Sequence, residues 1–181
     1  TYKLNFSDKS YDDIFANYSR SAKKPINIAR SIGVQVKILK DSDLKDYVNW
    51  LKINQVVTGK KYYVSEKAIK KDLDLGNKNG YIYEIFVAYL NNKILGSLGI
   101  WGFRNFISEH GVNISFFAKK NKIYVQEFIK DEIIKYCLKN DIQYYDLSGF
   151  NPNNDASNKE KSIKFFKEKF NGVKIIYDQI V

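Results

Sequence analysis

The sequence of 181 residues contains no methionine, one cysteine and one histidine. The lone Cys137 excludes an intrachain disulfide and a cysteine-based zinc cluster, and the lone His110 excludes a two-histidine metal site. We therefore predict no metal, and we expect Cys137 as a small buried hydrophobe and His110 as a strand or turn residue. Glycine-rich phosphate loops and the Gly-x-Ser-x-Gly element are also absent, which excludes the common nucleotide cradles and serine hydrolases.

Long apolar runs are missing as well. No stretch approaches the roughly 18 uninterrupted apolar residues of a membrane span. Lys3, Asp8 and Lys9 stand where a signal peptide needs its apolar region. These features predict a soluble domain. Because the chain starts with Thr1 and has no methionine, we expect it to be a segment of a longer protein.

Arginine is scarce although the net charge is +10, since 27 lysines accompany 3 arginines. Phosphate recognition favours arginine forks, and the basic residues are spread evenly over both halves of the sequence. The high content of Lys, Asn, Ile and Tyr is typical of an AT-rich coding sequence. The charge is therefore a weak signal for a polyanion, although a non-catalytic module that binds RNA or a partner domain stays open as an alternative.

Hydrophobic patterning changes repeatedly between the period of a helix and that of a strand. Alternating or β-branched runs predict strands at 2–6, 34–39, 82–90, 93–102, 107–117, 142–149 and 173–181. Helical stripes predict helices within 11–32, 41–57, 65–75, 125–138 and 158–172. The first of these stretches is split near Ser21, with Pro25 in the first turn of the second helix. This order predicts one α/β (α+β) domain over 1–181, with a mixed sheet flanked by helices.

Two local features sharpen this prediction. Asn91 and Asn92 tolerate the positive φ that a two-residue hairpin turn requires, so 82–90 and 93–102 are expected to pair. Glycines recur on the return strand, which indicates either a bulge and close approach or simple relief of twist (Gly96, Gly99 and Gly102).

The last predicted helix starts with a capping box formed by Ser157 and Glu160. At about 100° per residue, its apolar residues cluster on one face (Ile163, Phe166 and Phe170). Lys167 falls on the flank of this stripe, about 40° from Ile163, whereas Lys161 lies on the opposite side. Lys167 is therefore the lysine best placed to reach into a site bordered by Phe166. The structural alternative is a lysine whose stem lies along the edge of the core.

Four elements occur in an order that resembles the GNAT-fold domain of Fem-type aminoacyltransferases, which attach bridge amino acids to bacterial cell-wall precursors. They are the basic helix of 19–34 ending in Gly-Val, the hairpin of 84–98, Tyr-Tyr-Asp-Leu-Ser-Gly at 144–149 and Phe-Lys-Glu-Lys-Phe-Asn-Gly at 166–172. The succession covers nearly the whole chain. The resemblance implies a GNAT-like fold with a central, mostly antiparallel sheet.

The resemblance also implies roles for single residues. Lys167 would lie beside the donor ester and stabilise charge during transfer, with Phe166 next to it. Tyr145 and Asp146, from the Tyr-Asp-x-x-Gly element, would contact substrate. The implied donor is aminoacyl-tRNA, and the implied acceptor is an amine of a cell-envelope precursor. The implied location is cytoplasmic, at the inner face of the membrane. Full-length relatives carry two such domains, so the resemblance makes this chain the second of two, with a preceding GNAT-like domain as its partner.

One departure bears on the cofactor. Enzymes of the GNAT fold that use acyl-CoA carry a (Arg/Gln)-x-x-Gly-x-Gly loop before their central helix, and the equivalent run at 119–126 has no glycine. We therefore predict that 119–126 does not cradle a CoA pyrophosphate, and no cofactor is assigned. The competing hypothesis is an N-acetyltransferase that uses acetyl-CoA to acylate an amino sugar or amino acid.

Overall fold

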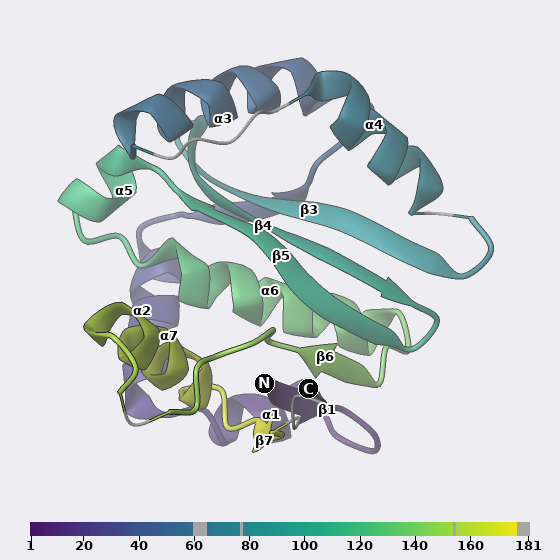
Figure 1. Ribbon diagram of the computed structural model, residues 1–181, viewed down its shortest axis with the longest axis vertical. Coiled ribbons are helices and arrows are strands. Elements are labelled where there is room, and N and C mark those ends of the chain that lie inside the picture. Colours follow the sequence, from purple (N-terminus) through teal and green to yellow (C-terminus); the bar gives the residue numbers. More distant parts are fainter. Residues whose placement is uncertain (60–64, 77, 154, 177–181) are drawn as a thin grey trace.

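The computed structural model describes residues 1–59, 65–76, 78–153 and 155–176. Their strands form one sheet in the order β2-β3-β4-β5-β6-β1-β7 (Figure 1). The strands are β1 (Tyr2–Asn5), β2 (Gln35–Ile38), β3 (Tyr81–Leu90), β4 (Lys93–Phe103), β5 (Phe106–Ile114), β6 (Tyr144–Asp146) and β7 (Val173–Lys174). The helices are α1 (Tyr11–Ala16), α2 (Arg20–Ser31), α3 (Leu44–Val57), α4 (Glu66–Leu75), α5 (Phe116–Lys120), α6 (Val125–Lys139) and α7 (Asn158–Glu168), with a 3₁₀ turn at Asp41–Asp43.

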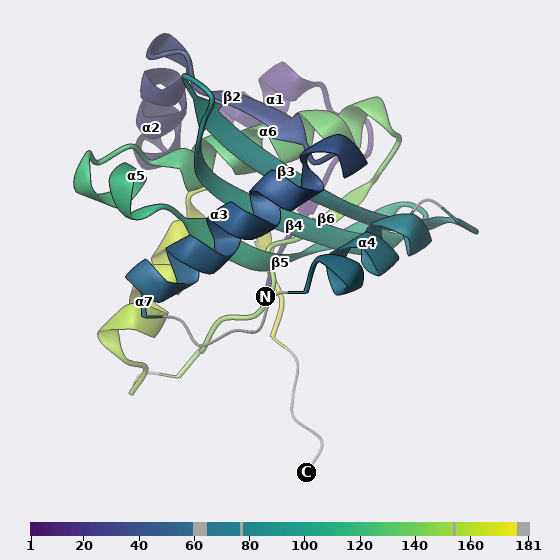
Figure 2. The ribbon, with the colours of Figure 1, turned by 90° about the horizontal axis from the view of Figure 1, so that it is seen from above.

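Helices cover both faces of the sheet. Figures 1 and 2 show α3 and α4 on one face, with α1, α2 and α6 on the other. The larger core lies under α2 and α6, where Ile26, Leu98 and Ile133 have no exposed surface. The smaller core lies under α3 and α4 around Tyr47 and Val87. This arrangement confirms the predicted mixed α/β sheet flanked by helices.

The hairpin of β3 and β4 confirms the firmest local prediction. The two strands pair from Tyr81 opposite Phe103 to Leu90 opposite Lys93. Asn91 and Asn92 form the turn with φ of 48° and 62°. Two left-handed residues in succession match the right-handed twist of the flanking strands, which is why asparagine is favoured there.

The glycines of β4 allow β5 to approach closely, which decides between the two alternatives. A Cβ atom at Gly102 would lie 2.0 Å from the carbonyl oxygen of Phe106. The register between β4 and β5 also shifts between Ser97 and Gly99. Close approach at an irregular pairing explains these glycines better than twist relief alone.

β5 and β6 form the one parallel pair among the described strands, and they separate after three residues. Phe106 pairs with Tyr144 and Ser108 with Asp146. Beyond Ser108, β5 continues to Ile114, whereas the chain after β6 turns away at Ser148, whose φ is 64°. A gap therefore opens between the end of β5 and the segment that leads to α7.

Two predicted strands are too long. The strand predicted at 107–117 ends at Ile114, because the side chain of Ser115 accepts a hydrogen bond of 3.0 Å from the amide of Ala118 and starts α5. The strand predicted at 142–149 pairs only over 144–146, since the turn at Ser148 removes the following residues from the sheet.

The remaining boundaries hold with smaller corrections. Pro25 is the sixth residue of α2 and lies inside the helix, not in its first turn, because α2 already starts at Arg20 after the N-cap Ser19. The capping box of Ser157 and Glu160 is present and α7 begins at Asn158 as predicted. For the closing strand predicted at 173–181, β7 covers Val173–Lys174, and 177–181 lie outside the described residues.

Candidate functional site

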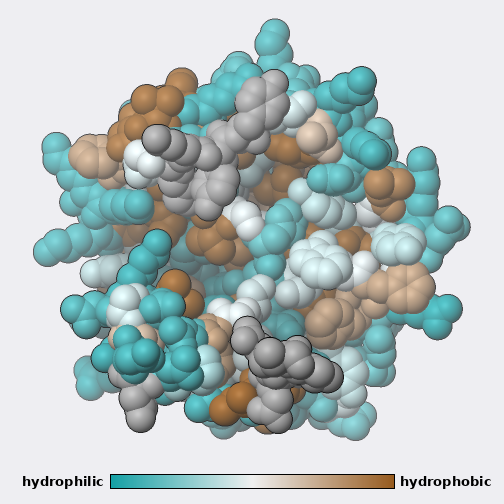
Figure 3. Space-filling model, in the orientation of Figure 1, coloured by the Kyte–Doolittle hydropathy of each residue, from teal (hydrophilic) through white to brown (hydrophobic). Residues whose placement is uncertain are grey.

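A cleft of about 910 Å³ lies where β5 and β6 separate, between α6 and α7; we call it the α6–α7 cleft. Its floor is apolar and comes from β5, α5, α6, α7 and the segment after β6 (Val112, Ile114, Ala118, Val125, Leu147 and Phe166). Six lysines also line it (Lys119, Lys122, Lys130, Lys159, Lys167 and Lys169), against two carboxylates (Glu109 and Glu127). Figure 3 shows hydrophilic side chains over α7 and apolar side chains in the recess beside it. The cleft therefore combines an apolar floor with a cationic rim.

Lys167 lies inside this cleft and is 6% exposed. Its Nζ donates hydrogen bonds of 2.8 Å to the carbonyl of Ser148 and 2.5 Å to the carbonyl of Gly149. An ammonium has three donors, and these two carbonyls use two of them. The third has no partner among the described residues, so it can donate to a group bound in the cleft.

The environment of Lys167 makes its charge sensitive to pH. The pKa of Lys167 is lowered to about 8, chiefly by burial and also by the nearby Lys130, while the carboxylates of Glu109 and Asp146 act in the opposite direction. At pH 7 the protonated form still predominates. The side chain thus presents an ammonium in a partly desolvated site, where its field is stronger than in water.

Phe166 is partly buried and faces the same cleft. Two cations lie over its ring, Lys130 with Nζ 5.4 Å from the centroid and Lys169 with Nζ 5.1 Å from it. Phe170, the next residue of the stripe, is buried and packs edge-on against Phe166. Ile163 was expected in the core but is 38% exposed, because it lines the mouth of the cleft.

Tyr145 lies beneath the cleft rather than in it. Its side chain is fully buried, and its hydroxyl donates a hydrogen bond of 2.7 Å to Oε1 of Glu109. Lys130, from α6, donates to the same oxygen and forms a buried ion pair with Glu109. Burial and the carboxylate of Glu109 raise the pKa of Tyr145 well above its ordinary value. The structure therefore places Tyr145 out of direct reach of a substrate and gives it a supporting position under Lys130.

Asp146 is half-buried and lines a second hollow that adjoins β6. Its carboxylate accepts a hydrogen bond of 2.7 Å from the amide of Ser148 and another from the hydroxyl of Thr1. Ser148 and Gly149 line both this hollow and the α6–α7 cleft. The structure thus joins Lys167 and Phe166 in one cleft, whereas Asp146 shapes the turn whose carbonyls hold Lys167.

The first turn of α6 carries a carboxylate on the cleft side. Glu127 is 4% exposed and accepts a hydrogen bond of 3.0 Å from Nζ of Lys169. A carboxylate at this position already complements the positive end of the helix. A phosphate approaching the same turn would meet the carboxylate of Glu127.

Sequence reasoning missed Glu109 and Lys130. Glu109 lies next to His110 on a strand in which polar and apolar residues are mixed, and Lys130 lies at the edge of the apolar face of α6. Seven successive residues of α6, from Val125 to Asp131, are buried. That burial reflects packing on both sides of the helix, and a pattern based on one apolar face does not reveal it.

The structure also bears on Cys137, on metal ligands and on membrane-spanning helices. Cys137 is fully buried and its thiol pKa is raised by burial, which confirms the expectation of an interior hydrophobe. Across the part of the chain that the structure describes, no three His, Cys, Asp or Glu side chains gather as metal ligands. The helices of those residues include none long and apolar enough to cross a membrane.

Known structures share this architecture. FemX superposes on 94% of this chain with a TM-score of 0.75 at 13% identity. L-PGS from Bacillus licheniformis superposes on 95% with a TM-score of 0.66, also at 13% identity. The chain spans 57% and 56% of these two proteins. The aminoglycoside acetyltransferase meta-AAC0020 from an uncultured soil metagenomic sample, in complex with sisomicin, matches 84% of this chain and 98% of its own length, with a TM-score of 0.56 at 13% identity.

No family model and no curated protein matches the sequence. The structural likenesses nevertheless show that the chain is a GNAT-fold domain of Fem-like architecture.

Proposed function

We propose that this domain is an acyltransferase of the Fem type, which takes an aminoacyl group from aminoacyl-tRNA and passes it to an amine of a cell-envelope precursor. The observation that carries the proposal is the ammonium of Lys167. It is buried in a cleft of the right size for the end of a carrier, and two backbone carbonyls hold it in place. Structures that share this fold include an aminoglycoside acetyltransferase, an enzyme that transfers an acyl group.

The chemistry fits the position of Lys167. Attack of an amine on an ester carbonyl gives a tetrahedral intermediate whose oxygen carries negative charge. A donor held in place before that charge develops lowers the barrier, and the remaining N–H of Lys167 is such a donor. The apolar floor excludes water from the ester, which limits hydrolysis.

The cationic rim fits an anionic carrier. Lys119, Lys122 and Lys159 are exposed around the mouth of the cleft and can contact phosphates of a tRNA acceptor end. The carboxylate of Glu127 lies on the helix turn where a CoA pyrophosphate would sit. A tRNA carrier, whose phosphates lie outside the cleft, therefore fits better than CoA.

The chain spans 57% of FemX and 56% of L-PGS, which supports extending the proposal to a partner domain. If the chain acts as the second of two GNAT-like domains, the preceding domain completes the binding site for the acceptor. The domain would then act in the cytoplasm, at the inner face of the membrane where envelope precursors are made.

Thermal shift distinguishes the proposed donor from its competitor. A ligand at 100 times its dissociation constant stabilises a protein by about 2.7 kcal/mol, which is about 5–10 °C for a domain of this size. We expect charged tRNA to raise the melting temperature of the chain and acetyl-CoA to leave it unchanged. A shift with acetyl-CoA alone would favour the N-acetyltransferase, and a shift with uncharged tRNA as large as with charged tRNA would favour an RNA-binding module.

A further inference from the structure

Exposed aromatic and basic side chains gather on α5 and on the turn that joins it to α6. Phe116, Phe117 and Tyr124 are between 48% and 56% exposed. Figures 1 and 2 show α5 at the edge of the molecule, beyond the end of β5. A folded domain gains no stability from aromatic rings held in water, so several of them at one place indicate a binding surface. With the three lysines between them they form what we call the α5 platform (Phe116, Phe117, Lys119, Lys120, Lys122 and Tyr124).

The lysines of the α5 platform have no counter-charge. Between Glu109 and Glu127 the sequence contains no aspartate or glutamate. Within the described part of the chain, none of the three ammonium groups forms an ion pair. Unpaired cations so close together favour a ligand that carries several negative charges.

The buried Ala118 determines how the side chains of α5 point. Ala118 has no exposed surface, and the amide of Asn121 bonds to the carbonyl of Phe117 at 3.0 Å, as in a helical turn. At about 100° per residue, Phe116 and Lys120 both lie opposite Ala118 and one turn apart. An aromatic ring and an ammonium group are therefore neighbours on the outer face of α5.

The α5 platform continues into the α6–α7 cleft. Lys119, Lys122 and Tyr124 line the cleft, and Phe116 and Phe117 come just before these lining residues in the chain. A ligand that covers the platform and also enters the cleft must be narrow. It must also carry negative charges and flat groups along its length, to match the lysines and the rings.

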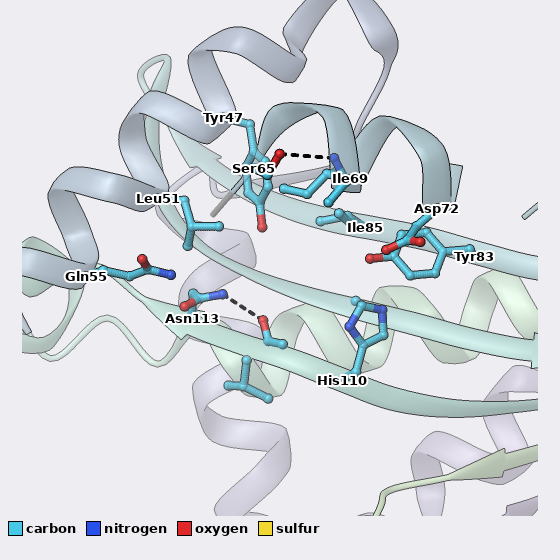
Figure 4. A pocket seen from close by; sticks show the side chains of 14 residues that line it. Tyr47, Leu51, Gln55, Ser65, Ile69, Asp72, Tyr83, Ile85, His110 and Asn113 are labelled. Atoms are coloured by element: carbon cyan, nitrogen blue, oxygen red, sulfur yellow. Dashed lines mark hydrogen bonds between the residues drawn. The ribbon is translucent and has the colours of Figure 1, made fainter. Parts of the chain in front are cut away.

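The other face of the sheet lacks this basic character. A cavity of about 510 Å³ lies there between α3, α4 and the strands, and Figure 4 shows the side chains around it. No lysine or arginine is among the described residues that line it, whereas Asp72 is. The basic surface at α5 is therefore local and does not simply follow from the net charge of +10.

We propose that the α5 platform binds the single-stranded 3′ end of an RNA carrier, with bases stacked on its aromatic rings and phosphates beside its lysines. Proteins hold single strands in this way, with a basic groove along the backbone and aromatic side chains against the bases. The inference rests on the proposed transfer reaction and adds the surface that holds its donor.

The position of Lys167 favours RNA over a lipid surface, which is the other anionic partner that aromatic and basic side chains fit. Lys167 lies inside the cleft, with little exposed surface. A single strand can pass from the platform through the mouth of the cleft, so that the ester on its last ribose reaches this ammonium. A flat membrane would cover the mouth and leave Lys167 without a partner.

Binding to the platform can be measured without transfer. The probe is a fluorescein-labelled RNA hexamer that ends in CCA, titrated with the protein at low salt and followed by fluorescence anisotropy. The control oligomer keeps the phosphates and has abasic sites in place of the bases. We expect the hexamer to bind saturably and the abasic oligomer to bind at least about fivefold more weakly, the lower end of what one stacked base contributes.

Substitution by leucine separates stacking from hydrophobic contact. Phe116→Leu and Phe117→Leu each keep an apolar side chain and lose the flat ring. Each should weaken hexamer binding by about fivefold, whereas insertion into lipid would tolerate the change. Phe103→Leu is the matched control, because this exposed phenylalanine pairs with Phe106 at the opposite end of β5 from α5. It should bind the hexamer as the wild type does.

The salt dependence tests the lysines. For a single strand, each phosphate contact contributes about −0.7 to the slope of log K against log salt concentration. Lys122→Gln should therefore make this slope shallower by about 0.7. Lys71→Gln, an exposed lysine of α4, should leave the slope unchanged.

Equal binding of hexamer and abasic oligomer, wild-type binding by both leucine variants, or no saturable binding would each overturn the inference. Binding to phosphatidylglycerol vesicles that both leucine variants retain, without hexamer binding, would assign the surface to lipid instead. If the hexamer does not bind but charged tRNA still raises the melting temperature and supports transfer, the platform alone is refuted. If the hexamer binds but charged tRNA gives neither a thermal shift nor transfer, the proposed function is refuted.

Discussion

The imidazole of His110 lies across Gly99, in the space that any other residue at that position would fill with its Cβ atom. The two residues stand opposite each other on β5 and β4. A Cβ atom built on Gly99 would lie 2.4 Å from both Cε1 and Nε2 of His110. The missing side chain on β4 thus determines where the imidazole sits.

Substitution of Gly99 tests this relationship. In Gly99→Ala the new methyl group displaces the ring, because two non-bonded heavy atoms cannot remain 2.4 Å apart. The overpacking should cost about 1–3 kcal/mol of stability, measured by urea unfolding. In His110→Ala the ring is absent, so the same methyl group in the double variant Gly99→Ala/His110→Ala should cost less than it does in the wild type. An equal cost in both backgrounds would show that Gly99 acts through the backbone.

Lys167 should matter for transfer more than its neighbours on α7. Lys167→Met removes the ammonium and should lower kcat by about 100-fold, the effect of losing one donor to an oxyanion. Lys161→Met, an exposed lysine on the opposite side of the helix, is the matched control and should be fully active. Steady-state kinetics with saturating donor separate the two variants.

The same substitution should also cost stability. Loss of the ammonium leaves the carbonyls of Ser148 and Gly149 without their partner. We expect about 1–3 kcal/mol of destabilisation, measured by urea unfolding. Lys167→Arg, which retains a charged donor, distinguishes the effect on stability from the effect on transfer. If Lys167→Met is unfolded and Lys167→Arg is active, Lys167 has a structural role.

The pH profile of transfer should have an alkaline limb. Lys167 must be protonated, so kcat/KM falls as pH rises through about 8, the pKa that burial imposes on this lysine. Lys167→Arg should shift the alkaline limb beyond pH 10, since arginine stays protonated there. An alkaline limb that is unchanged in Lys167→Arg would exclude Lys167 as its origin.

The ion pair of Glu109 and Lys130 should support the cleft floor. Removal of one partner leaves the other charge buried, so Glu109→Gln or Lys130→Met should each cost about 3–5 kcal/mol. The double variant should cost less than the sum of the two. Tyr145→Phe, which loses one hydrogen bond to Glu109, should cost about 1 kcal/mol without a change in KM for the donor. A large change in the KM for the donor would support the substrate-binding role that the resemblance implied for Tyr145.

The elements with strong local signals could be predicted from the sequence. Asn91 and Asn92 set a turn that depends on their own φ values, and Ser157 with Glu160 forms a cap within one helical turn. Lys167 and Phe166 reach one cleft because both positions follow from the period of a single helix.

Features that depend on distant parts of the chain could not be predicted. The buried contact of Glu109 with Lys130 joins β5 to α6, and the position of His110 depends on Gly99 of another strand. The early ends of β5 and β6 follow from Ser115 and Ser148, whose effect depends on where the sheet closes. The even spread of lysines along the sequence likewise conceals the six that the fold gathers around the α6–α7 cleft.

The measurement that tests the central claim most directly is single-turnover transfer of label by this chain. The two donors are tRNA charged with a mixture of [¹⁴C]amino acids and [¹⁴C]acetyl-CoA, and the acceptors are a panel of amines that includes 1,5-diaminopentane. We predict that label leaves charged tRNA for an amine faster with the protein than without it, and that Lys167→Met abolishes most of this rate. Transfer from acetyl-CoA alone, no transfer from either donor above the uncatalysed rate, or an unimpaired Lys167→Met variant would contradict the account.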